Sequence, residues 1–341
     1  RWLDRLARLR GAPQRGAPER GRESGAGLLR DGRRSSHRDR RGAGGNRLPI
    51  RSQYKAWEGF VEGIWPIVEG VEGIENLSLE AGFRFSSFNP QGDTSTWKVG
   101  ATWETIPGLR FRYMEQRAVR VPNIGEIGSP VTTGLDNATF DPCSVGNTGT
   151  ISADLAALCV ATGVPSSLVG SVQDIISGQV NVFTGTNPLD LPDPETARTR
   201  TAGVVWQFDP GTGGFTNTTL SLDYYRINIR DFIDTPTGQE SLDLCYVLAD
   251  PTACGGIVRI GGALTVSGTG VPAFITNFDF FRSEGLQFGL RTGYELEDWG
   301  SLSFSMNANL YLTNEFQTTA VSDLIDCKGR YGTSCDPVPK W

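Results

Sequence analysis

Two stretches of alternating apolar and polar residues flank a glycine-rich turn near the middle of the chain. The even-numbered positions from 202 to 208 and from 220 to 224 are apolar or aromatic, and most of the positions between them are polar or glycine. Residues 209–214, with three glycines and a proline, form the turn that joins them. This pattern predicts an antiparallel hairpin spanning 195–229, with one apolar and one polar face. Each arm exceeds a usual soluble strand and approaches the roughly 9 to 11 residues that cross a bilayer obliquely, which favours a membrane barrel.

The same alternation predicts further strands before and after this hairpin. They lie at 54–68, 77–86, 97–104, 109–113, 286–295 and 301–312, and a ninth strand begins at 338–341. The connections are short at 69–76, 106–109, 209–214 and 296–300, brief at 89–95, and long at 118–195, 231–276 and 317–337. Because consecutive strands reverse direction, all the long connections fall on one side, as in outer-membrane barrels with short periplasmic turns and long extracellular loops. Residues 152–176 in the first long loop could form one or two short helices, broken at Gly163 and Pro165.

Composition narrows the class of membrane protein. The 341 residues include 43 glycines, two methionines and one histidine, and no apolar run reaches 18 residues. A transmembrane helix is therefore absent from the sequence, whereas alternating strands remain compatible with it. We expect an all-β protein: a fragment of a transmembrane antiparallel β-barrel, with about eight to nine strands and long extracellular loops.

Charge divides the chain into two parts. Residues 1–51 hold 15 arginines against five acidic residues, which leaves 17 basic and 33 acidic side chains in residues 52–341. A basic arm could bind nucleic acid or an anionic membrane surface. Arginine without lysine, mixed with glycine, alanine and proline, instead favours a disordered arm that is read out of frame or is otherwise non-native. We therefore expect a domain boundary at 51/52, with the partial barrel in 52–341 and no nucleic-acid partner.

Six cysteines fall as close pairs inside the three long loops. The predicted disulfides join Cys143 to Cys159, Cys245 to Cys254 and Cys327 to Cys335. Disulfides imply an oxidising compartment. A metal site is the weaker reading, because no Cys-x-x-Cys spacing occurs and the single histidine is His37.

The sequence favours no enzymatic chemistry and no cofactor. With only His37, the predicted barrel offers no Ser-His-Asp or Cys-His arrangement, and no phosphate-binding or dinucleotide-binding fingerprint follows a strand. Arg84, Arg198, Arg200 and Arg291 are candidates for the barrel lumen, where they could hold a plug or an anionic substrate, or simply form a hydrated wall.

Residues 54–341 resemble the C-terminal barrel of TonB-dependent outer-membrane receptors. The matching segments are Arg117-Ala-Val-Arg-Val-Pro-Asn-Ile124, Asn187-Pro-Leu, Pro194-Glu-Thr-Ala197, Leu222-Asp-Tyr-Tyr-Arg-Ile-Asn-Ile229, the Cys245 to Cys254 loop and Glu284-Gly-Leu-Gln-Phe288. The resemblance implies a barrel of about 22 strands, filled by an N-terminal plug. It further implies a bacterial outer-membrane location and active uptake of a siderophore, cobalamin, saccharide or similar nutrient.

The partners implied by this resemblance are outer-membrane lipid and the TonB-ExbB-ExbD system, which would act through the plug domain. The sequence contains no recognisable plug, TonB box or full set of strands, so we expect a fragment whose edge strands need further pairing. A passive porin or a structural or adhesive outer-membrane barrel is the alternative.

Overall fold

The computed structural model describes residues 48–335 except 51, 188, 212, 321 and 331–334. Leu48–Trp341 forms one compact unit. The predicted arm at 1–51, apart from residues 48–50, lies outside the described residues. So does the ninth strand predicted at 338–341.

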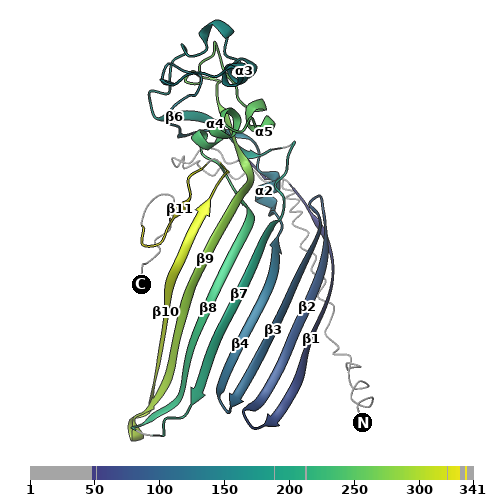
Figure 1. The fold of residues 1–341 in the computed structure, drawn as a ribbon, viewed down its shortest axis with the longest axis vertical. Coiled ribbons are helices and arrows are strands. Elements are labelled where there is room, and N and C mark those ends of the chain that lie inside the picture. Colours follow the sequence, from purple (N-terminus) through teal and green to yellow (C-terminus); the bar gives the residue numbers. More distant parts are fainter. Residues whose placement is uncertain are drawn as a thin grey trace, which may run out of the picture. The chain divides into compact units, whose positions relative to one another are not determined.

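An antiparallel sheet makes up most of this unit (Figure 1). Its strands are β1 (Lys55–Val71), β2 (Ile74–Asn89), β3 (Gly92–Ile106), β4 (Leu109–Arg120), β7 (Glu195–Phe208), β8 (Phe215–Asp234), β9 (Val271–Glu295), β10 (Ser301–Gln317) and β11 (Ile325–Asp326), in that spatial order. Each of the eight long strands pairs with its neighbour in this order, and the described sheet is open, with β1 at one edge. The predicted all-β partial barrel is confirmed.

Most strands are longer than the alternation predicts. β9, for example, covers 25 residues, whereas its clear alternation spans only 286–295. The turns are correspondingly tighter, since β1 ends at Val71 and β2 begins at Ile74. The strands extend beyond the part in which one face is uniformly apolar, so the period-two signal ends before the strand does.

The pairing register gives the sheet two distinct faces. Residues directly opposite each other in an antiparallel ladder lie on the same face. The apolar face therefore carries Trp103, Phe111, Val204, Leu222, Phe288 and Ala308, which form one continuous row from β3 to β10. The polar face carries the row Thr102, Arg112, Gly203, Asp223, Gln287 and Asn309.

The apolar positions form a band that crosses the strands obliquely. On β10 this band covers 302–310, and on β1 it covers 57–68, so its height matches the roughly 9 to 11 residues needed to cross a bilayer. The loop-side end of the band is not level across the sheet. When residues paired across the strands are compared, the band extends closer to the long loops on β1 to β3 than on β4 to β10. A planar apolar layer that cuts tilted strands produces this displacement.

The long loops after β4 and β8 fold together into a loop cap, which we define as residues 121–194 and 235–270. Its elements are α2 (Ile124–Gly128), β5 (Thr132–Asn137), α3 (Ala153–Ala161), the 3-10 turn η2 (Ser166–Leu168), β6 (Gln179–Thr186), α4 (Gly238–Tyr246) and α5 (Pro251–Gly255). The end of α3 before Gly163, and the start of η2 after Pro165, confirm the predicted helix break. The pattern of the sequence does not predict α4, α5, β5 or β6.

The hydrophobic core of the described unit lies mainly in this cap. Leu242, Leu264, Val164, Val180 and Val271 are almost completely buried and belong to one cluster. The cap joins the sheet through β6, which pairs with β5 and runs parallel to the first residues of β9. The cap is thus a packed structure rather than a set of independent loops.

Short polar residues start the cap helices. The Ser152 hydroxyl accepts a hydrogen bond from the amide of Leu155 at the start of α3. Thr237 and Glu240 form a reciprocal capping box on α4, and Asp250 caps α5 just before Pro251. These caps satisfy amides that have no partner within the helix.

Candidate functional site

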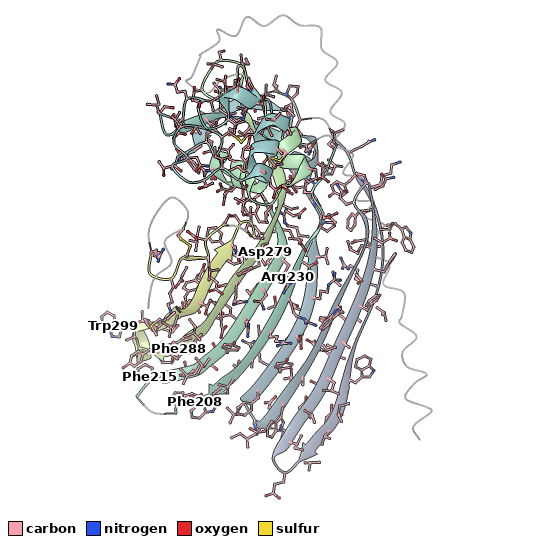
Figure 2. The ribbon with its side chains drawn as sticks, turned by 45° about the horizontal axis from the view of Figure 1, so that its top comes forward. Phe208, Phe215, Arg230, Asp279, Phe288 and Trp299 are labelled. Carbon is pink, nitrogen blue, oxygen red and sulfur yellow. A yellow bond between two sulfur atoms is a disulfide. The ribbon has the colours of Figure 1, made fainter. Side chains whose placement is uncertain are left out.

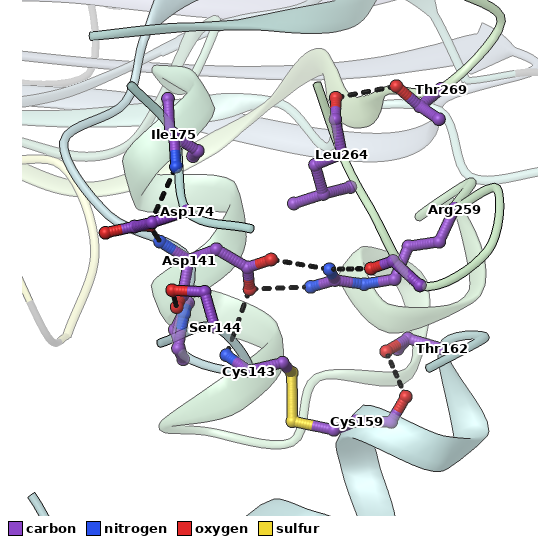
Figure 3. A network of polar contacts seen from close by, with 12 residues as sticks. Asp141, Cys143, Ser144, Cys159, Thr162, Asp174, Ile175, Arg259, Leu264 and Thr269 are labelled. Carbon is purple, nitrogen blue, oxygen red and sulfur yellow. Dashed lines mark hydrogen bonds and ion pairs between the residues drawn. A yellow bond between two sulfur atoms is a disulfide. The ribbon is translucent and has the colours of Figure 1, made fainter. Parts of the chain in front are cut away.

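The loop cap is held together by an ion pair between two fully buried side chains (Figure 3). Arg259 donates to both carboxylate oxygens of Asp141, from Nη1 at 2.6 Å and from Nη2 at 2.8 Å. Nη1 also donates to the carbonyl oxygen of Gly262 at 2.9 Å. The carboxylate accepts a further bond from the amide of Cys143 at 3.0 Å. Because both side chains are 0% exposed, each depends on the other for charge compensation.

Tyr246 extends this network toward α3. Its hydroxyl accepts from Nη2 of Arg259 at 2.8 Å and lies 2.6 Å from the hydroxyl of Thr162. Burial raises the pKa of Tyr246, so the phenol stays protonated. Burial alone would lower the pKa of Arg259, but the hydrogen bonds and charge of Asp141 outweigh it and leave that pKa raised. The network therefore carries one cation and one anion at neutral pH.

Two disulfides brace the same cap. Cys143 is joined to Cys159, and Cys245 to Cys254. The third disulfide joins Cys327 to Cys335 in the loop after β10. These are the three pairs that the sequence predicts, and all lie in connections at one end of the sheet. Cys143 also neighbours the buried ion pair, so the covalent and electrostatic links act on one region.

A second charged cluster fixes the base of the cap to the sheet. Arg120 at the end of β4 donates two bonds to Glu195 on β7, at 2.6 and 2.7 Å, and two to Glu126 on α2. Glu195 also accepts from the amide of Ile233 on β8 at 2.7 Å. The side chain of Asn123 caps α2. Arg120 and Asn123 lie in a segment that resembles TonB-dependent receptors, but the sequence alone does not indicate this role for them.

The polar face carries cross-strand ion pairs. Arg112 on β4 donates two bonds to Asp223 on β8, at 2.9 and 2.7 Å, across the intervening strand β7. Gly203 lies between them in the register, and a Cβ at that position would lie 1.8 Å from an oxygen of Asp223. Lys98 forms another ion pair with Glu62. Glycine at 203 therefore leaves space for the bridge to pass over β7.

The four arginines proposed for the lumen divide between the two faces. Arg84 lies on the polar face, 3.7 Å from Glu58, and Arg291 lies on the same face opposite Ser305. Arg198 and Arg200 lie on the opposite face, in register with Arg117 and Glu115 of β4.

The four therefore cannot line one surface, and the assignment of Arg198 and Arg200 beside Arg84 and Arg291 needs correction. The sequence contained the signal for this. Both residues share the even parity of Ala202, Val204 and Trp206, so alternation alone directs all five to one face.

Among the residues that the structure describes, no group of three or more His, Cys, Asp or Glu side chains could hold a metal ion. None of the helices in the described part of the chain has the length and apolar character needed to span a membrane.

The described part of the chain has the features of a transmembrane β-barrel wall. It is an open antiparallel sheet with an oblique apolar band on one face, paired charges on the other face and disulfide-braced loops at one end. The family model described as TonB dependent receptor-like, beta-barrel matches residues 20–341. The chain belongs to this family of TonB-dependent receptors. The match begins inside the 1–51 segment, and the domain boundary at 51/52 stays a prediction.

Several solved structures are similar over part of their length. The siderophore receptor PirA from Acinetobacter baumannii aligns with a TM-score of 0.45 and 13% identity, covering 78% of this chain and 29% of that one. A mutant of the ferric enterobactin receptor PfeA from Pseudomonas aeruginosa gives 0.44 and 14%, covering 78% and 28%. PirA from Pseudomonas aeruginosa gives 0.42 and 12%, covering 78% and 37%. The chain thus spans about a third of these receptors. A comparison with curated proteins found no match.

Proposed function

We propose that this chain forms part of the barrel wall of a bacterial outer-membrane receptor that takes up a nutrient actively. The nutrient would be a siderophore, cobalamin, a saccharide or a molecule of similar size. Energy would come from TonB-ExbB-ExbD acting through a plug domain, as in the family to which the chain belongs. The proposal includes no enzymatic step.

The observation that carries this proposal is the combination of a two-faced sheet with a rigid loop cap. The apolar band suits lipid, whereas the half-exposed ion pairs of the other face, such as Arg112 with Asp223, need water around them. We therefore assign the polar face, with Arg84 and Arg291, to the lumen. The cap would then be extracellular and the short turns periplasmic.

The cap is suited to covering a ligand above such a lumen. Two disulfides and the buried Asp141–Arg259 pair restrict its conformations, so its outer surface can stay organised without a bound ligand. Disulfides also agree with folding in an oxidising compartment such as the periplasm. Specificity would reside in the cap together with a plug.

Uptake by cells tests the proposal and separates it from passive diffusion. Cells with and without the gene would be given a radiolabelled ferric catecholate siderophore, cyanocobalamin or a maltodextrin. We expect the gene to confer accumulation of one ligand, and a protonophore to abolish that accumulation. Entry that persists with the protonophore and only equilibrates across the membrane would identify a porin. A lack of gene-dependent uptake for every ligand would oppose the proposed nutrient classes.

A matched pair of variants would assign the role of the cap. Asp141→Asn, which breaks the buried ion pair, should weaken ligand binding at the cell surface. Asp190→Asn changes an exposed residue of the same loop and should leave binding unchanged. Equal binding by the two variants would contradict the proposed role of an organised cap.

A further inference from the structure

Arginines gather on the apolar face directly beyond the loop-side limit of the apolar band. We call this group the arginine belt: Arg117 on β4, Arg198 and Arg200 on β7, Arg226 and Arg230 on β8, and Arg282 on β9. The register places all six on the face that carries Val204, Leu222 and Phe288. Figure 2 shows Arg230 near the cap end of its strand and Phe288 further toward the turns.

The belt presents positive charge outward. Arg200 lies 3.1 Å and Arg198 lies 3.5 Å from the same carboxylate of Glu115, and Arg282 lies 2.7 Å from Glu315. The side chains of Arg198 and Arg200 are 58% and 50% exposed, whereas that of Glu115 is only 19% exposed. The carboxylates therefore lie beneath the guanidinium groups.

The balance of charge in these rows is also positive. The three interleaved carboxylates are Glu115, Glu284 and Glu315, against six arginines. Arg226 lies 3.9 Å from Glu284, a long contact, and its side chain is 41% exposed. The arginines thus keep donors that can reach an outside anion.

Aromatic side chains accompany two of these arginines. The guanidinium of Arg198 lies over the ring of Trp97 at 6.0 Å, and that of Arg282 lies over the ring of Phe280 at 5.4 Å. Such cation–π contacts hold a guanidinium at a surface without neutralising it. Aromatic residues are also typical of the boundary between hydrocarbon and headgroups.

The opposite limit of the sheet has the reverse charge character. The turns and the adjoining strand ends there contain Glu69, Glu72, Glu75, Asp209 and Asp298. The charge asymmetry along the strands therefore distinguishes one membrane leaflet from the other.

We propose that the arginine belt binds lipid headgroups that bear a phosphate and a net negative charge, in the leaflet on the side of the loop cap. Guanidinium groups pair with phosphate through two parallel hydrogen bonds. The belt begins where the apolar band ends, which is the level of the headgroups. This inference rests on the membrane orientation given above and does not depend on any transported nutrient.

Lipid titration of the full chain tests the proposal. The protein would be purified in a neutral maltoside detergent, and native mass spectrometry would count bound dimyristoylphosphatidylglycerol or dimyristoylphosphatidylcholine, which share acyl chains but differ in net charge. We expect phosphatidylglycerol to bind about tenfold more tightly, since each arginine near an anionic surface contributes severalfold. The absence of this preference in the unmodified protein would overturn the proposal without any variant.

Two triple variants locate the preference. Arg198→Gln/Arg200→Gln/Arg282→Gln removes three charges from the belt and should reduce the preference to about twofold or less. Arg84→Gln/Arg110→Gln/Arg291→Gln removes three charges from the polar face and should retain it. Circular dichroism would verify the strand content of both triple variants. If the belt variant does not fold, the single variant Arg230→Gln takes its place, with a partial loss of the preference for phosphatidylglycerol expected.

The remaining outcomes are equally decisive. Equal loss in both triple variants would show a general charge effect and refute a belt site. Displacement of the lipid by inorganic phosphate at equal concentration would show a free-anion site, which also refutes lipid recognition. Failure of nutrient uptake in cells would leave these binding results unchanged, so the two proposals fail separately.

Discussion

The Asp141→Asn substitution tests whether the loop cap depends on its buried ion pair. Asparagine has nearly the same shape as aspartate, so packing in the cap would change little. Arg259 would nevertheless lose its counter-ion while remaining 0% exposed. Its remaining acceptors would be the carbonyl of Gly262, the hydroxyl of Tyr246 and the new side-chain amide oxygen.

The expected loss of cap stability is about 3 to 5 kcal/mol, the usual result of leaving a buried charge uncompensated. At about 1.4 kcal/mol per tenfold change in equilibrium, this corresponds to opening of the cap that is more frequent by a factor of roughly 10² to 4 × 10³. Arg259→Met should cost a similar amount, because the carboxylate of Asp141 would then be the unpaired group.

The double variant Asp141→Leu/Arg259→Met, compared with Asp141→Leu alone and Arg259→Met alone, separates charge compensation from packing. Both charges are absent from the double variant, so its destabilisation should be smaller than that of either single variant. A loss equal to the sum of the single effects would show that the two side chains act independently, and would refute the assigned pairing.

Hydrogen exchange measured by mass spectrometry is the appropriate assay, because it reports the opening of the cap separately from unfolding of the sheet. Peptides from 141–176 and 238–264 should exchange faster in Asp141→Asn, while peptides from β2 and β3 should not change. Asp190→Asn, at an exposed site in the cap, is the control. Acceleration of less than about tenfold in the cap would contradict the reasoning.

Three other substitutions give distinct outcomes. Gly203→Ala should lower the stability of the sheet to thermal unfolding by about 1 kcal/mol by displacing the ion pair that crosses β7, whereas Gly59→Ala, whose Cβ would meet only a ring atom at 4.0 Å, should not. Replacing both Cys143 and Cys159, which are 16 residues apart, by serine should destabilise the cap by about 3 kcal/mol. The cap amides should then exchange hydrogen faster, and an unchanged rate would oppose a bracing role for this disulfide. Burial raises the pKa of Asp243, so the folded cap binds a proton more readily and loses stability as pH rises above the ordinary aspartate range. Asp243→Asn should therefore stabilise the cap at about pH 7 but not at about pH 3, and an equal effect at both would exclude this titration.

Much of the sheet could be predicted because its signal is local. Period-two alternation identifies the membrane-crossing part of each strand, and the strict reversal of antiparallel strands places the long loops together. Cysteines separated by 16, 9 and 8 residues can close within their own loops, so their pairing follows from spacing. The segments that resemble TonB-dependent receptors contain residues such as Arg120 and Asn123, although their contacts were not foreseen.

The cap was not predictable in the same way. Its core joins two loops that are separated by the hairpin of β7 and β8, and Asp141 and Arg259 lie 118 residues apart. The short helix α4 has no long periodic pattern; its buried side includes Leu242 and Cys245 because the first loop packs against it. Such contacts arise only after the strands have paired.

Alternating strands, the side on which the loops lie and the likeness to one receptor family can all be inferred from the amino-acid order, since each depends on neighbouring residues. Which charges meet follows from the folded chain alone. The register sets Arg112 against Asp223, 111 residues away, and places Arg198 and Arg200 on the apolar face beyond the band. The physical reason is that alternation assigns a residue to a face, but only the paired strands and packed loops determine its position and partners.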